Sequence, residues 1–341
     1  MGFLLAPVLA CLLALSVPEL AAAGPFQAGV GRLTVPDPAS PFDVLVWYPT
    51  PDPEAPWQAG PFPVAASRNA ALADGPPFPL VLLSHGRGGG PLSHRDLAAG
   101  LAREGFIVAV PVHVGDAVGH PRSPTQAQIL MDRPRQAKQA LDAVLANPRF
   151  AGRADPDRVG MIGFSAGGYT ALVLAGARPS RAVAAAYCAG EGIGDRGSCP
   201  PLPEDAAGNA VLDGPRNDES ALDGWTPPTE PRLKALVLLD PLGVLFDRPG
   251  LASVRVPTLL LHPEDDSFMK AGPNAAALAR GLPRPPEQAV VPGAHFVFID
   301  PCPGALMAEE AFICEDAPGV DRPAVHRRIA GAVAGFLRRH L

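Results

Sequence analysis

The sequence predicts an α/β fold, with a mostly parallel sheet that carries helices on both of its faces. Two observations lead to this prediction. Short continuous apolar runs recur along the chain, as expected of strands that are buried on both faces. These runs alternate with segments of helical periodicity, the pattern of parallel sheets. Apolar residues make up 47% of the 341 residues, which is enough for a sizeable core.

Strands are expected over residues 42–48, 79–84, 106–112, 159–164, 234–239, 256–261 and 287–291. Helices are expected over 93–104, 132–146, 169–175 and 275–282, and a last helix over 325–337. Residues 50–78 are crowded with Pro, Gly and Ala and predict a surface connection. Residues 190–232 show no periodicity and predict an irregular insertion, either a lid over a site or an idle loop. With no repeat and no change of composition, residues 24–341 are expected to form one domain.

The run 159–164 ends in a Gly-Phe-Ser-Ala-Gly motif centred on Ser165, and a helical pattern follows directly. A strand, a tight turn and a helix in this order hold the central side chain exposed on a strained backbone. The flanking glycines are expected because a Cβ there would collide with a neighbouring element. Ser165 is therefore a candidate nucleophile, and a plain Gly-rich turn is the alternative.

A serine hydroxyl needs a base that takes its proton, and His295 is the expected base among the eight histidines. It stands late in the chain, after a strand, in a Gly-Ala-His-Phe turn suited to presenting a ring. His113, His120 and His262 also lie near strand ends. Each of these three is expected to be a pocket-wall or surface residue.

The base needs an acid that accepts its other ring proton, and two candidates remain. Asp266 lies one short loop beyond a strand end and is the first choice. Asp240 ends the preceding strand and is the alternative. Whichever of the two is not the acid is expected to cap a helix or bind a loop amide.

An oxyanion hole requires two backbone amides. The first amide of the helix after the nucleophile, that of Ala166, is one candidate. The other is expected from the Gly-rich loop after strand 79–84, at Arg87. That loop lacks the Lys-Ser/Thr ending of a phosphate-binding loop, so a nucleotide site is not expected.

The charge balance argues against nucleic acid as a partner, since the net charge is −6 and no basic run occurs. Cys188, Cys199, Cys302 and Cys314 remain if an N-terminal signal is removed. Four cysteines allow three disulfide pairings, of which sequence neighbours are the simplest, and four buried thiols are the alternative. No Cys-x-x-Cys spacing is present, and neither a metal nor a cofactor is expected.

Residues 3–17 are apolar apart from one proline and one serine, and three alanines follow at 21–23. This run is too short to span a bilayer and predicts a secretory signal peptide over residues 1–23. We therefore expect a secreted or periplasmic protein with no stable membrane anchor. The sequence does not fix the oligomeric state.

Three segments resemble the α/β-hydrolase superfamily: Ser84-His85-Gly86, the motif around Ser165, and Gly293-Ala294-His295-Phe296. Within it the chain is most similar to exported dienelactone-hydrolase-like proteins, which resemble platelet-activating-factor acetylhydrolases and, more distantly, cutinase-type polyesterases. The resemblance implies a serine nucleophile at Ser165 and a base at His295. It implies an acid at Asp266 or, in the acetylhydrolase pattern, at Asp240. Dienelactone hydrolases proper use a cysteine nucleophile, so the serine favours an ordinary esterase.

The sequence thus predicts an exported serine hydrolase that cleaves carboxylic esters, small or polymeric, through an acyl-enzyme. Acyl transfer or amide hydrolysis on the same scaffold is the alternative. A non-catalytic binding module is a further alternative, against which the intact set of site residues argues.

Overall fold

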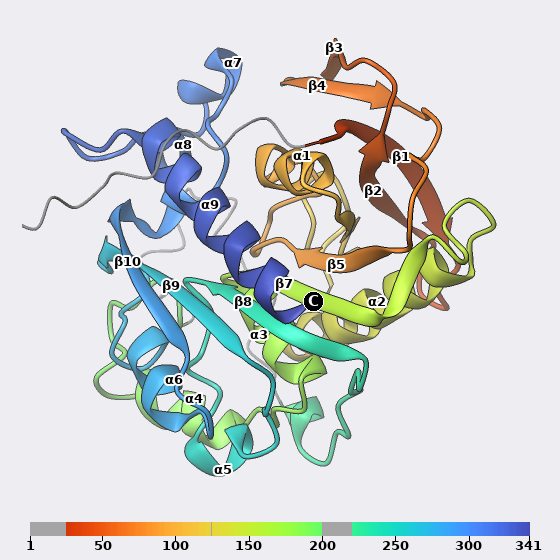
Figure 1. Cartoon of the computed structure of the whole chain (residues 1–341). Helices are drawn as coiled ribbons and strands as arrows, with labels where there is room; N and C mark the ends of the chain where they lie inside the picture. Colours follow the sequence, from red (N-terminus) through yellow and green to blue (C-terminus); the bar gives the residue numbers. More distant parts are fainter. Residues whose placement is uncertain (1–24, 124, 200–219) are drawn as a thin grey trace, which may run out of the picture.

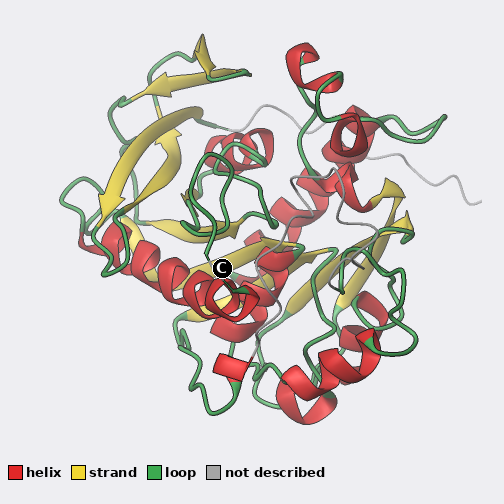
Figure 2. Cartoon of the chain, turned by 180° about the vertical axis from the view of Figure 1, so that it is seen from behind, coloured by secondary structure: helices red, strands yellow, loops and turns green. Residues whose placement is uncertain are grey.

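The computed structural model describes residues 25–123, 125–199 and 220–341. The described residues form a ten-stranded sheet with helices on both faces, an α/β-hydrolase fold (Figures 1 and 2). The strand order is β10-β9-β8-β7-β5-β6-β2-β1-β4-β3. From β10 to β6 every neighbouring pair is parallel, while β2 joins β6 and β1 in antiparallel register.

The strands are β1 (Gln27–Val35), β2 (Phe42–Thr50), β3 (Ala55–Ala59), β4 (Phe62–Arg68), β5 (Phe78–Ser84), β6 (Ile107–Pro111), β7 (Ala154–Phe164), β8 (Leu233–Leu239), β9 (Thr258–Asp265) and β10 (Glu287–Ala294). The α-helices are α1 (Arg95–Arg103), α2 (Gln126–Ala146), α3 (Ala166–Leu174), α4 (Arg181–Cys188), α5 (Arg248–Leu251), α6 (Ala275–Gly281), α7 (Gly304–Met307), α8 (Ala311–Cys314) and α9 (Arg322–His340). Two short 3₁₀ turns, η1 (Ser220–Leu222) and η2 (His295–Phe298), complete the described elements.

The apolar runs of the central strands supply two cores, one on each face of the sheet. In β5, Leu80 and Leu82 pack into the core beneath α2 and α3. Their neighbours Val81 and Leu83 pack into the core beneath α1 and α9. Because successive side chains of a strand point to opposite faces, a strand covered on both faces must be apolar throughout.

The predicted surface connection over 50–78 is wrong, because this segment contains the hairpin β3–β4. The pairing between these strands is antiparallel and lies at one end of the sheet. Most side chains of β3 are exposed, so it carries no apolar run that would reveal a strand in the sequence. Helix α2 also begins earlier than expected, at Gln126, where the hydroxyl of Thr125 accepts a hydrogen bond from the amide of Gln128.

Both expected disulfides between sequence neighbours are present, Cys188–Cys199 and Cys302–Cys314. Each closes a loop of about a dozen residues, which stabilises the fold by about 2–3 kcal/mol in the chain-entropy estimate. Such bonds persist in oxidising compartments and are typical of exported proteins. The predicted signal peptide and residues 200–219 of the predicted insertion lie outside the described residues.

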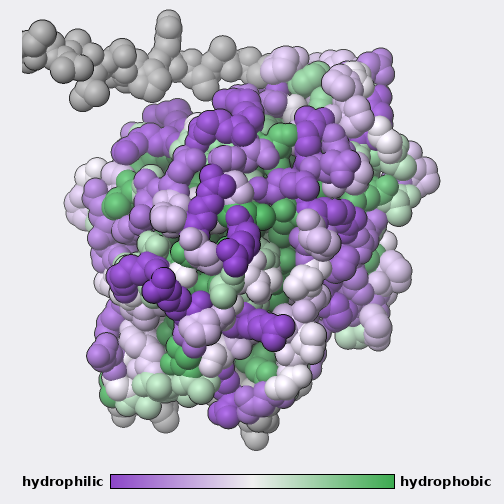
Figure 3. Space-filling model, turned by 60° about the horizontal axis from the view of Figure 1, so that its bottom comes forward, coloured by the Kyte–Doolittle hydropathy of each residue, from purple (hydrophilic) through white to green (hydrophobic). Residues whose placement is uncertain are grey.

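Among the described residues, no helix is both long and apolar enough to cross a bilayer. On the face shown in Figure 3, hydrophobic residues are interspersed with hydrophilic ones and form no single broad apolar surface.

Candidate active site

The parallel strands from β5 to β10 all end at the same edge of the sheet, and the candidate residues follow those ends. Ser165 comes directly after β7, Asp240 after β8, Asp266 after β9 and His295 after β10. Polar groups collected at the carboxyl edge of a parallel sheet are the usual setting of a site in this class of fold.

Ser165 occupies the tight turn that the motif predicts. Its backbone has φ 53° and ψ −116°, a conformation that residues other than glycine rarely adopt. Its amide donates to the carbonyl of Leu239, and its carbonyl accepts from the amide of Leu242. These two bonds fix the turn against the chain on either side of Asp240, and the side chain of Ser165 stays partly accessible.

The glycines of the motif are required by close packing, as the sequence predicts. A Cβ on Gly163 would lie 2.1 Å from the carbonyl oxygen of Gly167. A Cβ on Gly167 would lie 1.9 Å from the carbonyl oxygen of Ser84 at the end of β5. Any other residue at these two positions would push α3 away from the sheet and move Ser165 with it.

His295 is 2% exposed, and phenyl rings contact its imidazole. The rings of Phe164 and Phe268 lie 4.9 and 4.8 Å from it, and that of Phe296 lies 5.0 Å from it, centre to centre. Because Phe164 directly precedes Ser165, its contact with the imidazole brings the candidate base beside the turn of the candidate nucleophile. No hydrogen bond between the Ser165 hydroxyl and the imidazole is formed within the described residues.

Of the two candidate acids, Asp240 contacts the imidazole of His295, and the first choice, Asp266, does not. The Nδ1 atom of His295 lies 2.5 Å from the Oδ2 atom of Asp240, whose side chain is fully buried. Asp240 has a positive φ of 38°, and its amide donates to Leu261 on β9. This turn directs the carboxylate across the end of β9 toward β10, where the imidazole stands.

Asp266 lies near the pair without a hydrogen bond to it. Burial and the neighbouring Asp240 carboxylate raise the pKa of Asp266 to about 6. Its buried Oδ1 atom has no hydrogen-bond partner among the described residues. An acid that stabilises an imidazolium must be ionised and hydrogen-bonded to the ring, and Asp240 meets the second condition where Asp266 does not.

The two predicted oxyanion donors belong to segments that pack against each other. Ala166 begins α3, and Arg87 lies in the loop after β5. This loop is held by its neighbours, since the amide of Gly88 donates to the carbonyl of Asp116 and that of Val118 donates to the carbonyl of Gly89. Gly86 must be a glycine, because a Cβ there would lie 2.8 Å from the ring of Phe164.

A buried arginine that the sequence did not single out joins these two segments. Arg133 on α2 is 1% exposed, and its Nη1 atom donates to the carboxylate of Asp116 over 2.5 Å. Its Nη2 atom donates to the carbonyl of His85, and its Nε atom donates to Thr170 over 3.2 Å. Thr170 in turn donates to the carbonyl of Ala166 over 3.0 Å. One guanidinium thus connects the loop that carries Arg87 with the helix that begins at Ala166.

Two neutral histidines extend this buried network. Burial and the charge of Arg133 hold the pKa of His85 and that of His113 well below the usual range. The partners fix their tautomers: His113 accepts from the hydroxyl of Ser84 at 2.8 Å and donates to Gln136 at 3.3 Å. His85 accepts from the amide of His113 and donates to the carbonyl of Gly86. His113 is therefore a core residue, in contrast to the expected pocket-wall or surface position.

Arg133→Lys is expected to lower kcat about ten- to a hundredfold with little change in KM. Lysine keeps the charge but cannot reach Asp116, His85 and Thr170 together as the planar guanidinium does, and small displacements of reacting groups have effects of this size. The measurement is steady-state kinetics with thermal unfolding of the same samples. Arg103→Lys is the matched control, since Arg103 also donates through two nitrogens to a carboxylate, that of Glu54, but ends α1 on the side where β6 begins, away from the carboxyl edge of the sheet. Equal kcat values for the two variants would contradict the positioning role.

Within the described residues, no cluster of three or more His, Cys, Asp or Glu side chains is arranged to hold a metal ion. Arg133 and Phe268 could not be recognised in the sequence, because neither belongs to a motif and both act through contacts with distant segments.

Comparisons with known proteins bear on the family likeness and on the fold. Residues 68–209 match the model of the dienelactone hydrolase family. The structure is similar to a ferulic acid esterase from Streptomyces cinnamoneus, with a TM-score of 0.62 and 20% identity over 94% of this chain and 92% of that one. No curated protein matches the sequence. The expected resemblance to dienelactone-hydrolase-like proteins is confirmed, and the findings support a hydrolase.

Proposed function

We propose that this protein is an exported carboxylic ester hydrolase in which Ser165 is the nucleophile, His295 the base and Asp240 the acid. The observation that carries the proposal is the buried 2.5 Å contact between His295 and Asp240, beside a serine held at positive φ. A strained serine, an imidazole and a buried carboxylate at one sheet edge are the parts that acyl-enzyme chemistry requires. The disulfides and the predicted signal peptide support the export part.

The proposed reaction has two halves. His295 takes the Ser165 proton through Nε2 while the hydroxyl oxygen attacks the ester carbonyl, and Asp240 stabilises the imidazolium through Nδ1–H. The amides of Arg87 and Ala166 then bind the negative oxygen of the tetrahedral intermediate. The imidazolium protonates the departing alcohol, and water activated by the same ring releases the acid.

The similar solved structure is that of an esterase, which supports ester hydrolysis over amide hydrolysis or acyl transfer. The proposal is tested by titrating the acid that the purified protein releases from ethyl butyrate, with and without a fluorophosphonate. We expect release that the fluorophosphonate abolishes. If no acid is released, or if acid release continues after complete reaction with the fluorophosphonate, the proposal is refuted. A new ester formed when a second alcohol is added would identify acyl transfer instead.

A further inference from the structure

Three phenylalanine rings in mutual contact lead from the imidazole of His295 to the surface and are here called the aromatic row. It consists of Phe268 after β9, Phe296 in η2 and Phe312 in α8. The ring centres of Phe268 and Phe296 lie 4.9 Å apart, and that of Phe312 lies 5.6 and 5.1 Å from them. The first two also contact the imidazole. Three segments far apart in the sequence therefore build one aromatic surface at the base.

The aromatic row leads from the buried base to the protein surface. His295 is 2% exposed, the first two rings are half-buried, and Phe312 is 43% exposed. The guanidinium of Arg196 lies over the outermost ring, 5.1 Å from its centre. Large aromatic side chains left accessible next to a reacting group are typical of binding sites.

The two disulfides hold the segments that frame the aromatic row. Cys302–Cys314 ties α8, and with it Phe312, to the chain that leaves η2. Cys188–Cys199 closes the loop that contains Arg196. In this loop the amide of Gly197 donates to the carbonyl of Phe268 over 2.7 Å.

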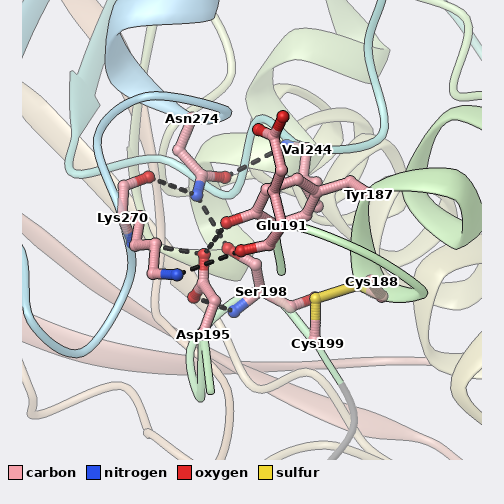
Figure 4. The surroundings of a disulfide bond; sticks show 9 residues. All are labelled: Tyr187, Cys188, Glu191, Asp195, Ser198, Cys199, Val244, Lys270 and Asn274. Atoms are coloured by element: carbon pink, nitrogen blue, oxygen red, sulfur yellow. Dashed lines mark hydrogen bonds between the residues drawn. A yellow bond between two sulfur atoms is a disulfide. The ribbon is translucent and has the colours of Figure 1, made fainter. Parts of the chain in front are cut away.

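Further bonds fasten the loop 188–199 to the segment after β9, as Figure 4 shows. The amide of Lys270 and the hydroxyl of Tyr187 both donate to the carboxylate of Asp195. The buried side chain of Asn274 donates to the hydroxyl of Ser198 over 2.7 Å and accepts from the amide of Val244. The framing segments are thus fixed in place, which preorganises the aromatic row for a ligand.

The exposed apolar side chains collect in these same segments. Five large ones are exposed among the described residues: Val118, Ile193, Val290, Met307 and Phe312. Ile193 lies in the loop 188–199, while Met307 and Phe312 lie in the loop 302–314. Three of these five side chains therefore belong to the two loops that the disulfides close.

We infer that the aromatic row is a subsite for an aromatic ring carried by the alcohol part of the ester. The inference rests on the proposed function, in which His295 protonates the departing alcohol. The alcohol oxygen must then lie within hydrogen-bond reach of the imidazole, and the groups beside that imidazole must line the leaving-group side. Offset or edge-on packing against the phenyl rings favours an aromatic ring over a saturated ring of similar size.

The test compares kcat/KM for 2-phenylethyl acetate and 2-cyclohexylethyl acetate, which share their acyl group, in a titration assay. We expect kcat/KM to be about three- to tenfold higher for the aromatic ester, which corresponds to the interaction energy of one aromatic pair. Phe312→Leu should reduce this preference to about one. Leucine keeps an apolar side chain at an exposed position, so the fold is expected to persist.

Phe62→Leu is the matched control. Phe62 also lies beneath an arginine, Arg95, at 5.0 Å, but on β4 at the other end of the sheet from β10. We expect this variant to keep the full aromatic preference. An equal loss of the aromatic preference in Phe312→Leu and Phe62→Leu would overturn the subsite.

A second pair of esters tests on which side of the bond the ring binds. Ethyl 3-phenylpropanoate and ethyl 3-cyclohexylpropanoate carry the ring on the acyl group. An aromatic preference that appears with this pair and disappears in Phe312→Leu would overturn the leaving-group assignment. Hydrolysis of ethyl acetate with no ring preference in either pair would overturn the subsite alone. Absence of Ser165-dependent hydrolysis of ethyl acetate would instead refute the proposed function.

Discussion

Asp240→Asn is expected to lower kcat about a thousand- to ten-thousandfold, whereas Asp266→Asn should leave it within a fewfold of the unchanged protein. Asp240 Oδ2 lies 2.5 Å from His295 Nδ1, so an amide in its place would favour the wrong ring tautomer and leave the imidazolium without a counter-charge. Asparagine has nearly the same shape as aspartate, so the loss would report on charge and tautomer. The measurement is kcat on ethyl butyrate for both variants.

The paired variant Asp266→Asn is the control for this prediction, because its carboxyl group lies near the same imidazole. A larger loss for Asp266→Asn than for Asp240→Asn would reverse the assignment. Equal and large losses would show that both carboxylates are required, which also contradicts the account.

Asp266→Asn is also expected to change the pH dependence of the protein's stability. The pKa of Asp266 is about 6 in the folded protein, above its ordinary value of 3.8, so the folded state binds the proton more tightly. Stability contributed by this group therefore falls as the pH rises from about 4 to about 6. Asp266→Asn should raise the melting temperature at pH 8 more than at pH 4, which a thermal unfolding series can measure.

Ser165→Ala is expected to reduce ester hydrolysis by at least a thousandfold, to the residual rate that oxyanion binding alone can support. The alanine has no oxygen to form an acyl-enzyme, while the turn that holds position 165 keeps its bonds to Leu239 and Leu242. Steady-state rates on ethyl butyrate and the melting temperature should be measured together. Activity within tenfold of the unchanged protein would exclude Ser165 as the nucleophile.

The central strands and the nucleophile's turn could be predicted because their causes are local. A strand buried on both faces must be apolar throughout, and the turn at Ser165 must have glycines where a Cβ would strike the backbone. The edge of the sheet was harder to predict. Strand β1 contains Gly29, where a Cβ would lie 2.3 Å from the ring of Tyr48 on β2, so its glycine reflects packing that the sequence does not show.

The sequence left Asp266 and Asp240 as candidate acids because both follow strand ends. Asp266 follows β9, which is the direct neighbour of β10, the strand before His295, and sheet order alone favours it. The choice depends on the positive φ of Asp240 and on the turn over 293–298, which returns the imidazole toward β8. Arg133 escaped prediction for the same reason, since its partners come from the loop after β5, from α3 and from the loop at Asp116.

The central claim is that Ser165, activated by His295 beside Asp240, forms a covalent acyl-enzyme. The most direct measurement is mass spectrometry of the protein after treatment with a fluorophosphonate, first intact and then as peptides. The account predicts one adduct per chain, located on Ser165, and its slow formation in Asp240→Asn. An adduct on another residue, or no adduct on a protein that hydrolyses esters, would contradict the account.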